Sequence, residues 1–449
     1  MKKEVDFLFR YEHKVREMES LMLIRTELER RGYTVAFDAN YDYKSKNNYT
    51  PKVFICPSLY SDANLALDFV KYGMVKKIGN LLWEQLFESE VEDKVDCPFN
   101  VRGIGQRAVS FCWGQRTKDR ICKGGVPEFN AKIVGQINGD YLRKEFASTL
   151  ISKSKLGSMY NLDSSRRWNF FISSFSGCEL DFAQKELSIA AFGEEATNYQ
   201  IDLANSSRSE ILKWFEVAMM KYSGDIFIYR PHPSEAKKSE ILKDLERKYQ
   251  NFRVITEQSI KHWISASDKI YNWYSTGHID IVMLGKPCRL LRPIAIRPAN
   301  DYRIFINSKQ INTLEDFMKD YENLDVIDVV DRNLLNEYYY IPDNFVYQNV
   351  CDILEEMLKT DHYDIKFTMK ERMNHYVRCT KKSVASLLKF AIPVLRYIPS
   401  VNSYLKKRQA IMEILINGYE RNVASDKEME EMKSRIMPIL YNKERITTI

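Results

Sequence analysis

Two short blocks in the second half of the chain combine residues that can bind a phosphate-linked group. In the first block, an apolar run at residues 226–229 is followed by Arg230 and by His232, which stands between two prolines. An apolar run of this length is typical of a buried parallel strand, and the prolines end it. His232 and Arg230 are therefore expected at the carboxyl edge of a sheet, where they can donate charge-assisted hydrogen bonds to a phosphate oxygen. The alternative is a turn histidine without a ligand.

The second block repeats this arrangement about forty residues later. A strand pattern at residues 269–273 ends in Ser275, Thr276 and Gly277, and an apolar helix is expected over residues 279–284. Hydroxyl groups and free backbone N–H groups at the start of a helix can hold an anion. The alternative for both hydroxyl residues is helix capping without a ligand.

A third small polar loop contains Ser173 and Ser174, directly after the strand predicted at residues 168–172. Such loops let backbone N–H groups approach a phosphate closely, although a structural turn explains the same residues. Ser234 is expected to cap a helix over residues 236–249, with Glu235 in its first turn. Two alternatives are open for Glu235: it contacts the ribose or the base of a nucleotide, or it faces solvent on that helix.

A carboxylate in the first half of the chain is the candidate general base. Glu84 directly follows a strand predicted at residues 78–82. Transfer of a group to a hydroxyl needs a base that removes the hydroxyl proton, and a carboxylate at a sheet edge suits this role. The alternative is a glutamate in the first turn of a helix, which the helix dipole favours without any chemistry.

These residues resemble a family of bacterial enzymes. The strand followed by Arg-Pro-His-Pro-x-Glu, with a later Ser-Thr-Gly before a helix that ends in Leu-Gly-Lys-Pro, resembles surface-carbohydrate biosynthesis proteins of the GT-B glycosyltransferase type. The pattern is similar to capsule β-Kdo transferases, to bacterial sialyltransferases with a His-Pro motif, and to CDP-glycerol polyol-phosphate transferases. It extends over roughly residues 1–360.

The resemblance implies two Rossmann-like parallel-sheet domains that face a cleft, and a second domain that binds the activated donor. It places the Ser173 loop beside the donor site and an acidic residue at the position of Glu84. A CMP-linked acidic sugar is favoured as donor, because the His-Pro motif is shared with enzymes of that donor class.

The order of the predicted elements agrees with an α/β fold. Strand and helix patterns alternate, which predicts parallel sheets, and 449 residues exceed what one core usually serves. The first sheet is expected from strands at residues 5–9, 34–37, 52–56, 78–82, 109–113 and 133–135, and the second from strands at residues 168–172, 226–229, 253–255, 269–273 and 288–291. The first predicted domain, residues 1–150, is expected to bind the acceptor, and the second, residues 165–360, is expected to bind the donor. A helix at residues 344–358 is expected to close the second domain, and a linker at residues 150–167 is expected to join the two. Residues 361–449 are predicted to form a helical extension.

Positive charge is concentrated in the extension. Residues 366–410 contain eleven Lys and Arg and one acid, Glu371. Within residues 380–410 the cations alternate with apolar residues, a composition typical of a helix in an anionic membrane interface. A helical appendage that packs on the rest of the protein is an equal alternative. No module for nucleic-acid binding is recognisable.

Other features point to a cytoplasmic enzyme without a metal ion. If the extension binds lipid, the enzyme is expected to be peripheral on the inner face of the plasma membrane. The N-terminus has no signal-peptide pattern, no apolar run could cross a bilayer, and the eight cysteines are scattered as expected for reduced thiols. No Asp-x-Asp pair stands at a strand end as a magnesium site, so the only small molecule expected is the nucleotide-activated sugar.

The predicted function is transfer of a sugar from a nucleotide donor to a surface-polysaccharide or lipid-linked acceptor. Three alternatives remain open: a CDP-polyol phosphotransferase, a sugar-nucleotide 2-epimerase, and a non-catalytic scaffold for capsule assembly that binds partners through residues 366–449.

Overall fold

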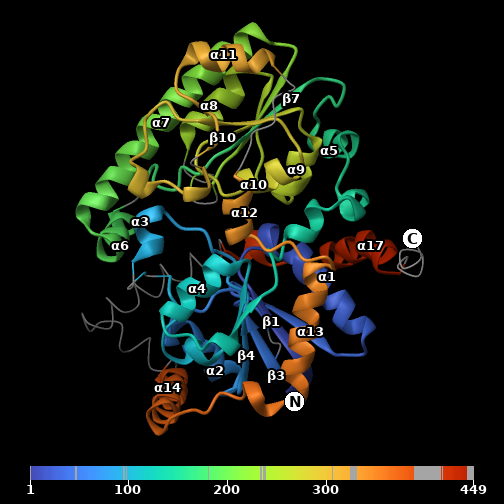
Figure 1. The fold of residues 1–449 in the computed structure, drawn as a ribbon, viewed down its shortest axis with the longest axis vertical. Helices are drawn as coiled ribbons and strands as arrows, with labels where there is room; N and C mark the ends of the chain where they lie inside the picture. The colour runs from blue at the N-terminus through green and yellow to red at the C-terminus, as the bar shows by residue number, and fades with distance from the viewer. Residues whose placement is uncertain are drawn as a thin grey trace. The chain divides into compact units, whose positions relative to one another are not determined.

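The computed structural model divides the chain into two compact units (Figure 1). It describes residues 2–45, 48–94, 97, 99–180, 182–232, 235, 239–305, 307–323, 331–388, 416 and 418–441. Unit 1 comprises Met1–Gln85, Val91–Asp140 and Asn336–Ile449, and unit 2 comprises Leu86–Glu90 and Tyr141–Leu335. Each unit is built around one six-stranded sheet.

Unit 1 contains a parallel sheet of order β2-β1-β3-β4-β5-β6. Helices α1 and α13 lie on one face, whereas α2 packs on the other face over an apolar cluster that includes Phe54 and Phe69. The strands are β1 (Lys3–Tyr11), β2 (Val35–Ala39), β3 (Tyr49–Cys56), β4 (Lys77–Asn80), β5 (Val109–Cys112) and β6 (Ala131–Ile133). The helices are α1 (Lys14–Arg30), α2 (Asp62–Tyr72), α4 (Gln115–Lys123), α13 (Val346–Lys359), α14 (Met369–Leu388) and α17 (Asp426–Tyr441), and α3 (Ser89–Asp93) and α12 (Arg332–Tyr338) each span a boundary between the units.

Unit 2 contains a parallel sheet of order β12-β11-β10-β7-β8-β9. Its strands are β7 (Trp168–Ile172), β8 (Ile226–Arg230), β9 (Phe252–Val254), β10 (Lys269–Asn272), β11 (Cys288–Leu291) and β12 (Gln310–Ile311). Its helices are α5 (Lys153–Tyr160), α6 (Phe182–Phe192), α7 (Glu194–Lys221), α8 (Glu240–Lys248), α9 (Ile260–Ala266), α10 (His278–Met283) and α11 (Leu314–Glu322).

Side chains of the unit 2 sheet alternate between two apolar cores, as the period of a strand requires. In β7, Phe171 packs with α7, α8 and α11, whereas Phe170 and Ile172 pack with α5, α9 and α10 on the opposite face. Because both faces are covered, the central strands are apolar almost throughout, which explains why they were predictable as short apolar runs. The predicted fold class, two Rossmann-like parallel-sheet domains with a helical C-terminal extension, is confirmed.

The return of the chain to unit 1 was not predicted. The helix expected to close the second domain is α13, and it packs against α1, β3 and β4 of unit 1. The Asp140 carboxylate accepts hydrogen bonds from the backbone N–H groups of Val346 (2.9 Å) and Tyr347 (2.8 Å), which satisfies the start of this helix. Unit 2 therefore ends at Leu335 rather than at residue 360, and the stretch expected as a linker contains α5 and belongs to unit 2.

The described part of the extension packs on unit 1. Helix α17 lies along α1, where Lys14 pairs with Glu428 (2.7 Å) and Arg435 with Glu19 (3.0 Å). Helix α14 contacts α2. The predicted membrane segment covers residues 380–410, and its part from residue 389 onward lies outside the described residues. Among the described residues, no helix is long and apolar enough to span a bilayer.

Candidate functional site

The three polar loops of unit 2 meet at one edge of its sheet. Strand β7 lies between β8 and β10, and Ile172 pairs with Arg230 on one side and with Asn272 on the other. The residues that follow these strands therefore start side by side. The chain runs from β7 through β8 to β9 on one side of β7 and then crosses over to β10 on its other side. The strand order therefore reverses between β7 and β10, and open α/β sheets bind their ligands at such a topological switch point.

A buried carboxylate connects two of these loops. Glu235 is 1% exposed and accepts hydrogen bonds from the Ser173 hydroxyl, the Tyr229 hydroxyl (2.6 Å) and the His232 backbone N–H (3.3 Å). Its own N–H donates to the His232 carbonyl (2.9 Å), which closes a tight turn. Arg208 of α7 lies 3.6 Å from the carboxylate and is also buried. Glu235 thereby fixes the backbone of His232 relative to the loop after β7.

Glu235 does not occupy the predicted helical position, because α8 begins only at Glu240. The predicted solvent-facing position is wrong. The capping role expected of Ser234 lies outside the described residues. Burial raises the pKa of Glu235, against the opposing effects of its hydrogen bonds and of Arg208. A contact to a ribose or base would have to replace one of the internal bonds, so the structure favours a positioning role.

Arg230 organises the neighbouring loop. Its guanidinium donates to the carbonyl oxygens of Ile255 (3.4 Å), Glu257 (2.6 Å) and Gln258 (2.8 Å). Burial lowers the pKa of Arg230 to about 10. Gln258 has a φ of +60°, an unfavourable value for a residue with a side chain, and the Arg230 contact helps to hold it there.

The loop after β10 is fixed by a buried asparagine that the sequence analysis did not single out. The Asn272 amide donates to the Ser275 carbonyl (2.7 Å) and accepts from the Ser275 N–H (2.8 Å). The Ser275 hydroxyl accepts from the Gly277 N–H (3.2 Å), so it has a local capping contact. Ser275, Thr276 and Gly277 are partly exposed at the edge. A polar residue at the end of a strand, directly before the predicted loop, was the available signal for Asn272.

The remaining predicted residues of unit 2 lie at the same edge. Ser173 is buried, and its hydroxyl also accepts from the Phe175 N–H (3.2 Å), whereas Ser174 is half-buried. His232 is half-buried. Ser174, His232, Ser275 and Thr276 are thus the predicted residues with surface available for a ligand, while Ser173 and Arg230 hold the loops.

A second cluster at the ends of β10 and β11 was missed. Arg292 follows β11, is 1% exposed, and pairs with Asp301 (3.0 Å) below the ring of Tyr274. Its Nε and Nη1 atoms have no hydrogen-bond partner among the described residues. Nearby, Glu88 accepts a hydrogen bond from Asn300 (3.3 Å), and burial raises the pKa of Glu88. Glu88 comes from the short segment Leu86–Glu90 that crosses into unit 2, which no local sequence pattern indicates.

The predicted base Glu84 belongs to unit 1. It lies in the loop after β4 with its side chain 56% exposed, and it pairs with Arg16 of α1 (2.7 Å). Arg16 also pairs with the buried Glu17 (2.9 Å). The next residue, Gln85, bonds to the carbonyls of Leu82 (2.9 Å) and Phe111 (2.8 Å), which fixes this loop. Because α3 starts only at Ser89, the helix-dipole explanation for Glu84 does not apply.

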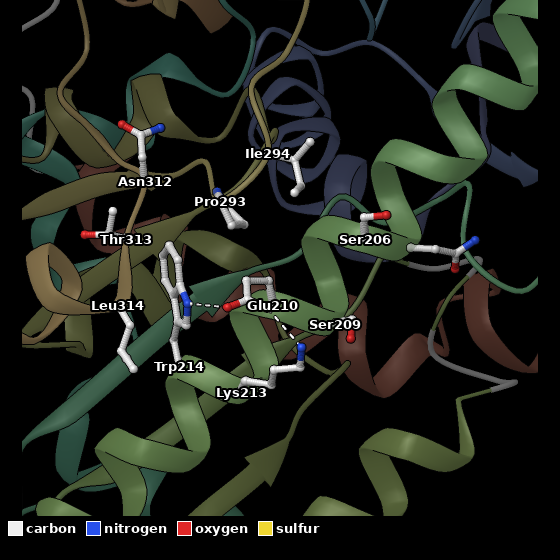
Figure 2. A pocket seen from close by; sticks show the side chains of 11 residues that line it. Ser206, Ser209, Glu210, Lys213, Trp214, Pro293, Ile294, Asn312, Thr313 and Leu314 are labelled. Carbon is white, nitrogen blue, oxygen red and sulfur yellow. Dashed lines mark hydrogen bonds and ion pairs between the residues drawn. The ribbon is translucent and has the colours of Figure 1, made fainter.

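A hollow of about 770 Å³ lies elsewhere in unit 2. Figure 2 shows Ser206, Ser209, Glu210 and Lys213 of α7 on one side, with Glu210 bonded to both Trp214 and Lys213. The opposite side is formed by residues that follow β11 and β12: Pro293, Ile294, Asn312, Thr313 and Leu314. None of the predicted site residues lines this hollow, which lies at the ends of the outer strands.

The described residues contain no group of three or more His, Cys, Asp or Glu side chains arranged to hold a metal ion. All eight cysteines are free thiols, and Cys56 and Cys351 have a raised pKa because they are buried. Their predicted reduced state agrees with this geometry.

Comparison with known proteins relates this chain to solved structures only. No protein-family model and no curated protein matches the sequence. A variant of the wall teichoic acid polymerase TagF, soaked with CDPG, matches with a TM-score of 0.53 and 10% identity over 79% of this chain and 89% of that one. Another TagF variant matches with a TM-score of 0.51 and 9% identity, with the same coverage of both chains.

The UDP-GlcNAc 2-epimerase of Methanocaldococcus jannaschii, solved with UDP-GlcNAc and UDP, gives a TM-score of 0.49 and 13% identity over 79% of this chain and 99% of that one. Identities this low relate folds and not activities. The chain shares the fold of the TagF structures, with two Rossmann-like parallel-sheet domains of the GT-B type.

Proposed function

We propose that the protein is a glycosyltransferase that moves a sugar from a nucleotide donor to a surface-polysaccharide or lipid-linked acceptor. The observation that carries this proposal is the meeting of three polar loops, after β7, β8 and β10, at the switch point of the unit 2 sheet. Ligands of open α/β sheets bind at such points, and the side chains here suit a phosphate ester.

The proposed donor site uses the exposed groups of these loops. The Ser275 and Thr276 hydroxyls, the Ser174 loop and the His232 imidazole would donate to the phosphate of the nucleotide. Negative charge grows on this phosphate as the glycosidic bond breaks, so donors fixed around it stabilise the transition state more than the ground state. His232 could also donate a proton to the leaving phosphate.

The buried groups would keep these donors in place. Glu235 holds the His232 backbone and the Ser173 hydroxyl, and Arg230 holds the loop at residues 255–258. Preorganised donors need no rearrangement during the reaction, which is the main source of electrostatic catalysis. In this proposal charge is stabilised by side chains of the chain itself, without a resident metal ion or cofactor.

We assign the base to Glu84. Its carboxylate is exposed and is oriented by Arg16, so it can accept the proton of an acceptor hydroxyl. The proposal requires this group to reach the same substrate as the donor site. The preferred donor is a CMP-linked acidic sugar, which rests on the resemblance of the His-Pro block to enzymes of that class.

The test combines a donor screen with a histidine variant. The purified protein is incubated with CMP-, CDP-, UDP- and GDP-linked compounds, and binding is measured by thermal shift. A shift with one class identifies the base, and donor consumption with glycan product supports transfer. His232→Ala should reduce turnover by roughly 100-fold or more without a change in melting temperature. The matched control is His362→Ala, which removes an exposed histidine of unit 1.

Retained turnover in His232→Ala would remove this histidine from the mechanism. A protein that shows no shift with any nucleotide compound would instead fit the scaffold alternative.

A CDP-polyol phosphotransferase is the second candidate. It is favoured by the fold match to TagF, a wall teichoic acid polymerase, at a TM-score of 0.53. It would use the same phosphate-binding edge but would release CMP from a CDP-alcohol. Release of CMP with transfer of phosphorus to the acceptor would establish this activity, whereas interconversion of two sugar nucleotides without an acceptor would establish a 2-epimerase.

A further inference from the structure

Helix α14 has two faces of different character. Toward unit 1, Glu371 pairs with Arg107, and the His375 ring contacts Phe69 of α2 (6.4 Å between ring centroids). Toward solvent, the helix presents four large apolar side chains, whose exposed fractions are 75%, 55%, 68% and 43%. They are Met369, Met373, Tyr376 and Val377.

The exposed apolar residues form one stripe. Their spacing of four, seven and eight positions places them on the same side of an α-helix. Single exposed apolar residues are normal on a protein surface, but a contiguous stripe indicates a surface that binds something. Nothing in the described part of unit 1 covers these side chains.

Positive charge borders this stripe. By their spacing along the helix, three exposed cations flank the stripe, namely Lys370, Arg372 and Lys381, whereas Arg378 and Lys382 project from the other side of the helix. Its only acid, Glu371, is engaged with Arg107. In the sequence, the next 28 residues add five more Lys and Arg and no acid. This helix face therefore combines an apolar stripe with flanking cations, and its carboxylate is engaged elsewhere. Such a face is complementary to a lipid surface, which has an apolar interior and anionic headgroups at its boundary with water.

We propose that the outer face of α14 docks on an anionic lipid bilayer, with Met373 and Tyr376 in the acyl boundary and the flanking cations at the phosphate headgroups. The inner contacts with α2 fix the helix to the rest of unit 1, so docking would orient this unit on the membrane. This inference goes beyond the proposed activity and does not depend on it. It would place an enzyme of this kind next to a lipid-linked acceptor.

The test measures binding of the full chain to vesicles by sedimentation. Vesicles of phosphatidylcholine alone are compared with vesicles that also contain phosphatidylglycerol. The wild-type protein should bind the anionic vesicles and lose binding as salt is added, since exposed charges are screened. Changing Met373→Glu together with Tyr376→Glu should weaken binding by roughly tenfold or more, because it places carboxylates in the apolar stripe. The matched control is Met220→Glu, which changes a residue of α7 that is 64% exposed in unit 2 and should leave binding unchanged.

A second variant separates charge from apolar contact. Lys370→Gln with Lys381→Gln should weaken binding to anionic vesicles by about 30-fold, because each cation near an anionic surface contributes about 1 kcal/mol. The circular dichroism of each variant checks that it is folded, and Met373→Ser with Tyr376→Ser replaces the glutamate pair if that pair unfolds. Equal binding of wild type and stripe variants would overturn the proposal. So would equal binding to both kinds of vesicle, or a self-associated protein that the stripe variants convert to a monomer.

Discussion

The buried Glu235 offers the sharpest test of how the loops of the proposed donor site are held at the edge of the unit 2 sheet. We expect Glu235→Gln to lower the free energy of unfolding although it keeps the shape of the side chain. In the wild type, Oε2 accepts from the Ser173 hydroxyl and the His232 N–H, while Oε1 accepts from the Tyr229 hydroxyl and lies 3.6 Å from Arg208. Glutamine offers one oxygen and one NH₂ group in their place.

Either orientation of the new amide loses an interaction. If its NH₂ group replaces Oε2, the His232 N–H faces another donor and cannot rotate away. If the NH₂ group replaces Oε1, a donor faces the buried guanidinium of Arg208, which loses an opposite charge. A buried hydrogen bond to a charged group contributes about 1.5–3 kcal/mol, so we expect a loss of about 2 kcal/mol. For a unit of this size that corresponds to a decrease in melting temperature of roughly 4–8 °C.

The assay is thermal unfolding of wild type and variant, together with hydrogen exchange of the His232 and Ser173 amides. Glu240→Gln is the matched control, because Glu240 begins α8 with its side chain 71% exposed and should change stability by less than about 0.5 kcal/mol. Exchange at both amides should be faster in the Glu235 variant and unchanged in the control. If the Glu235 variant unfolds like the wild type with unchanged exchange, the carboxylate does not connect the two loops and the positioning argument fails.

Three further predictions address other parts of the chain. Arg230→Lys should accelerate amide exchange at residues 255–259, because the lysine ammonium has its donors on one nitrogen and cannot span the carbonyls that the two guanidinium nitrogens reach; unchanged exchange there would contradict this. Glu84→Gln should lower kcat by roughly 100-fold and leave the KM for the donor unchanged, and an unaltered kcat would exclude it as the base. Burial raises the pKa of Asp68 from 3.8 to about 6, although the nearby Arg10 acts in the opposite direction. The protonated form of Asp68 is therefore favoured in the folded state, and this contribution to the free energy of unfolding is full at low pH and is lost as pH rises through about 6. Between about pH 4 and pH 7, wild type should therefore lose roughly 2 kcal/mol of stability relative to Asp68→Asn in urea unfolding, and a difference independent of pH would contradict the raised pKa.

The sheet strands other than β12 were predictable because each carries its own signal, whereas β12 (Gln310–Ile311) is only two residues long and was not predicted. Runs such as residues 226–229 are short, apolar and followed by prolines, and the register then places Arg230 beside Ile172 without further information. The three polar loops were found for the same reason, since each directly follows a strand. Parallel strands bring their carboxyl ends to one edge, so local patterns were sufficient to identify Ser173, His232 and Ser275 as neighbours.

Contacts between distant segments were not predictable from local patterns. Nothing in the sequence of α13 states that its first turn is capped by Asp140, or that Leu86–Glu90 crosses into unit 2. The error on Glu235 has a similar origin. A glutamate near a proline and before helix formers suits a first helical turn, but the tertiary bonds to Ser173 and Tyr229 hold it in a turn that ends before α8.

The burial of Glu235 and the exposure of Glu84 suit these two glutamates to the different roles proposed for them. Both follow a parallel strand, and both lie close to an arginine, Arg208 for Glu235 and Arg16 for Glu84. Both carboxylate oxygens of Glu235 accept hydrogen bonds from buried protein donors, so chemistry at this carboxylate would first require these bonds to break. Glu84 has more than half of its side chain exposed and one ionic partner on a neighbouring helix, so a hydroxyl can approach it without such a cost. Of the two, only Glu84 can take a proton while the fold around it stays intact, which is the requirement for a group that acts in every turnover.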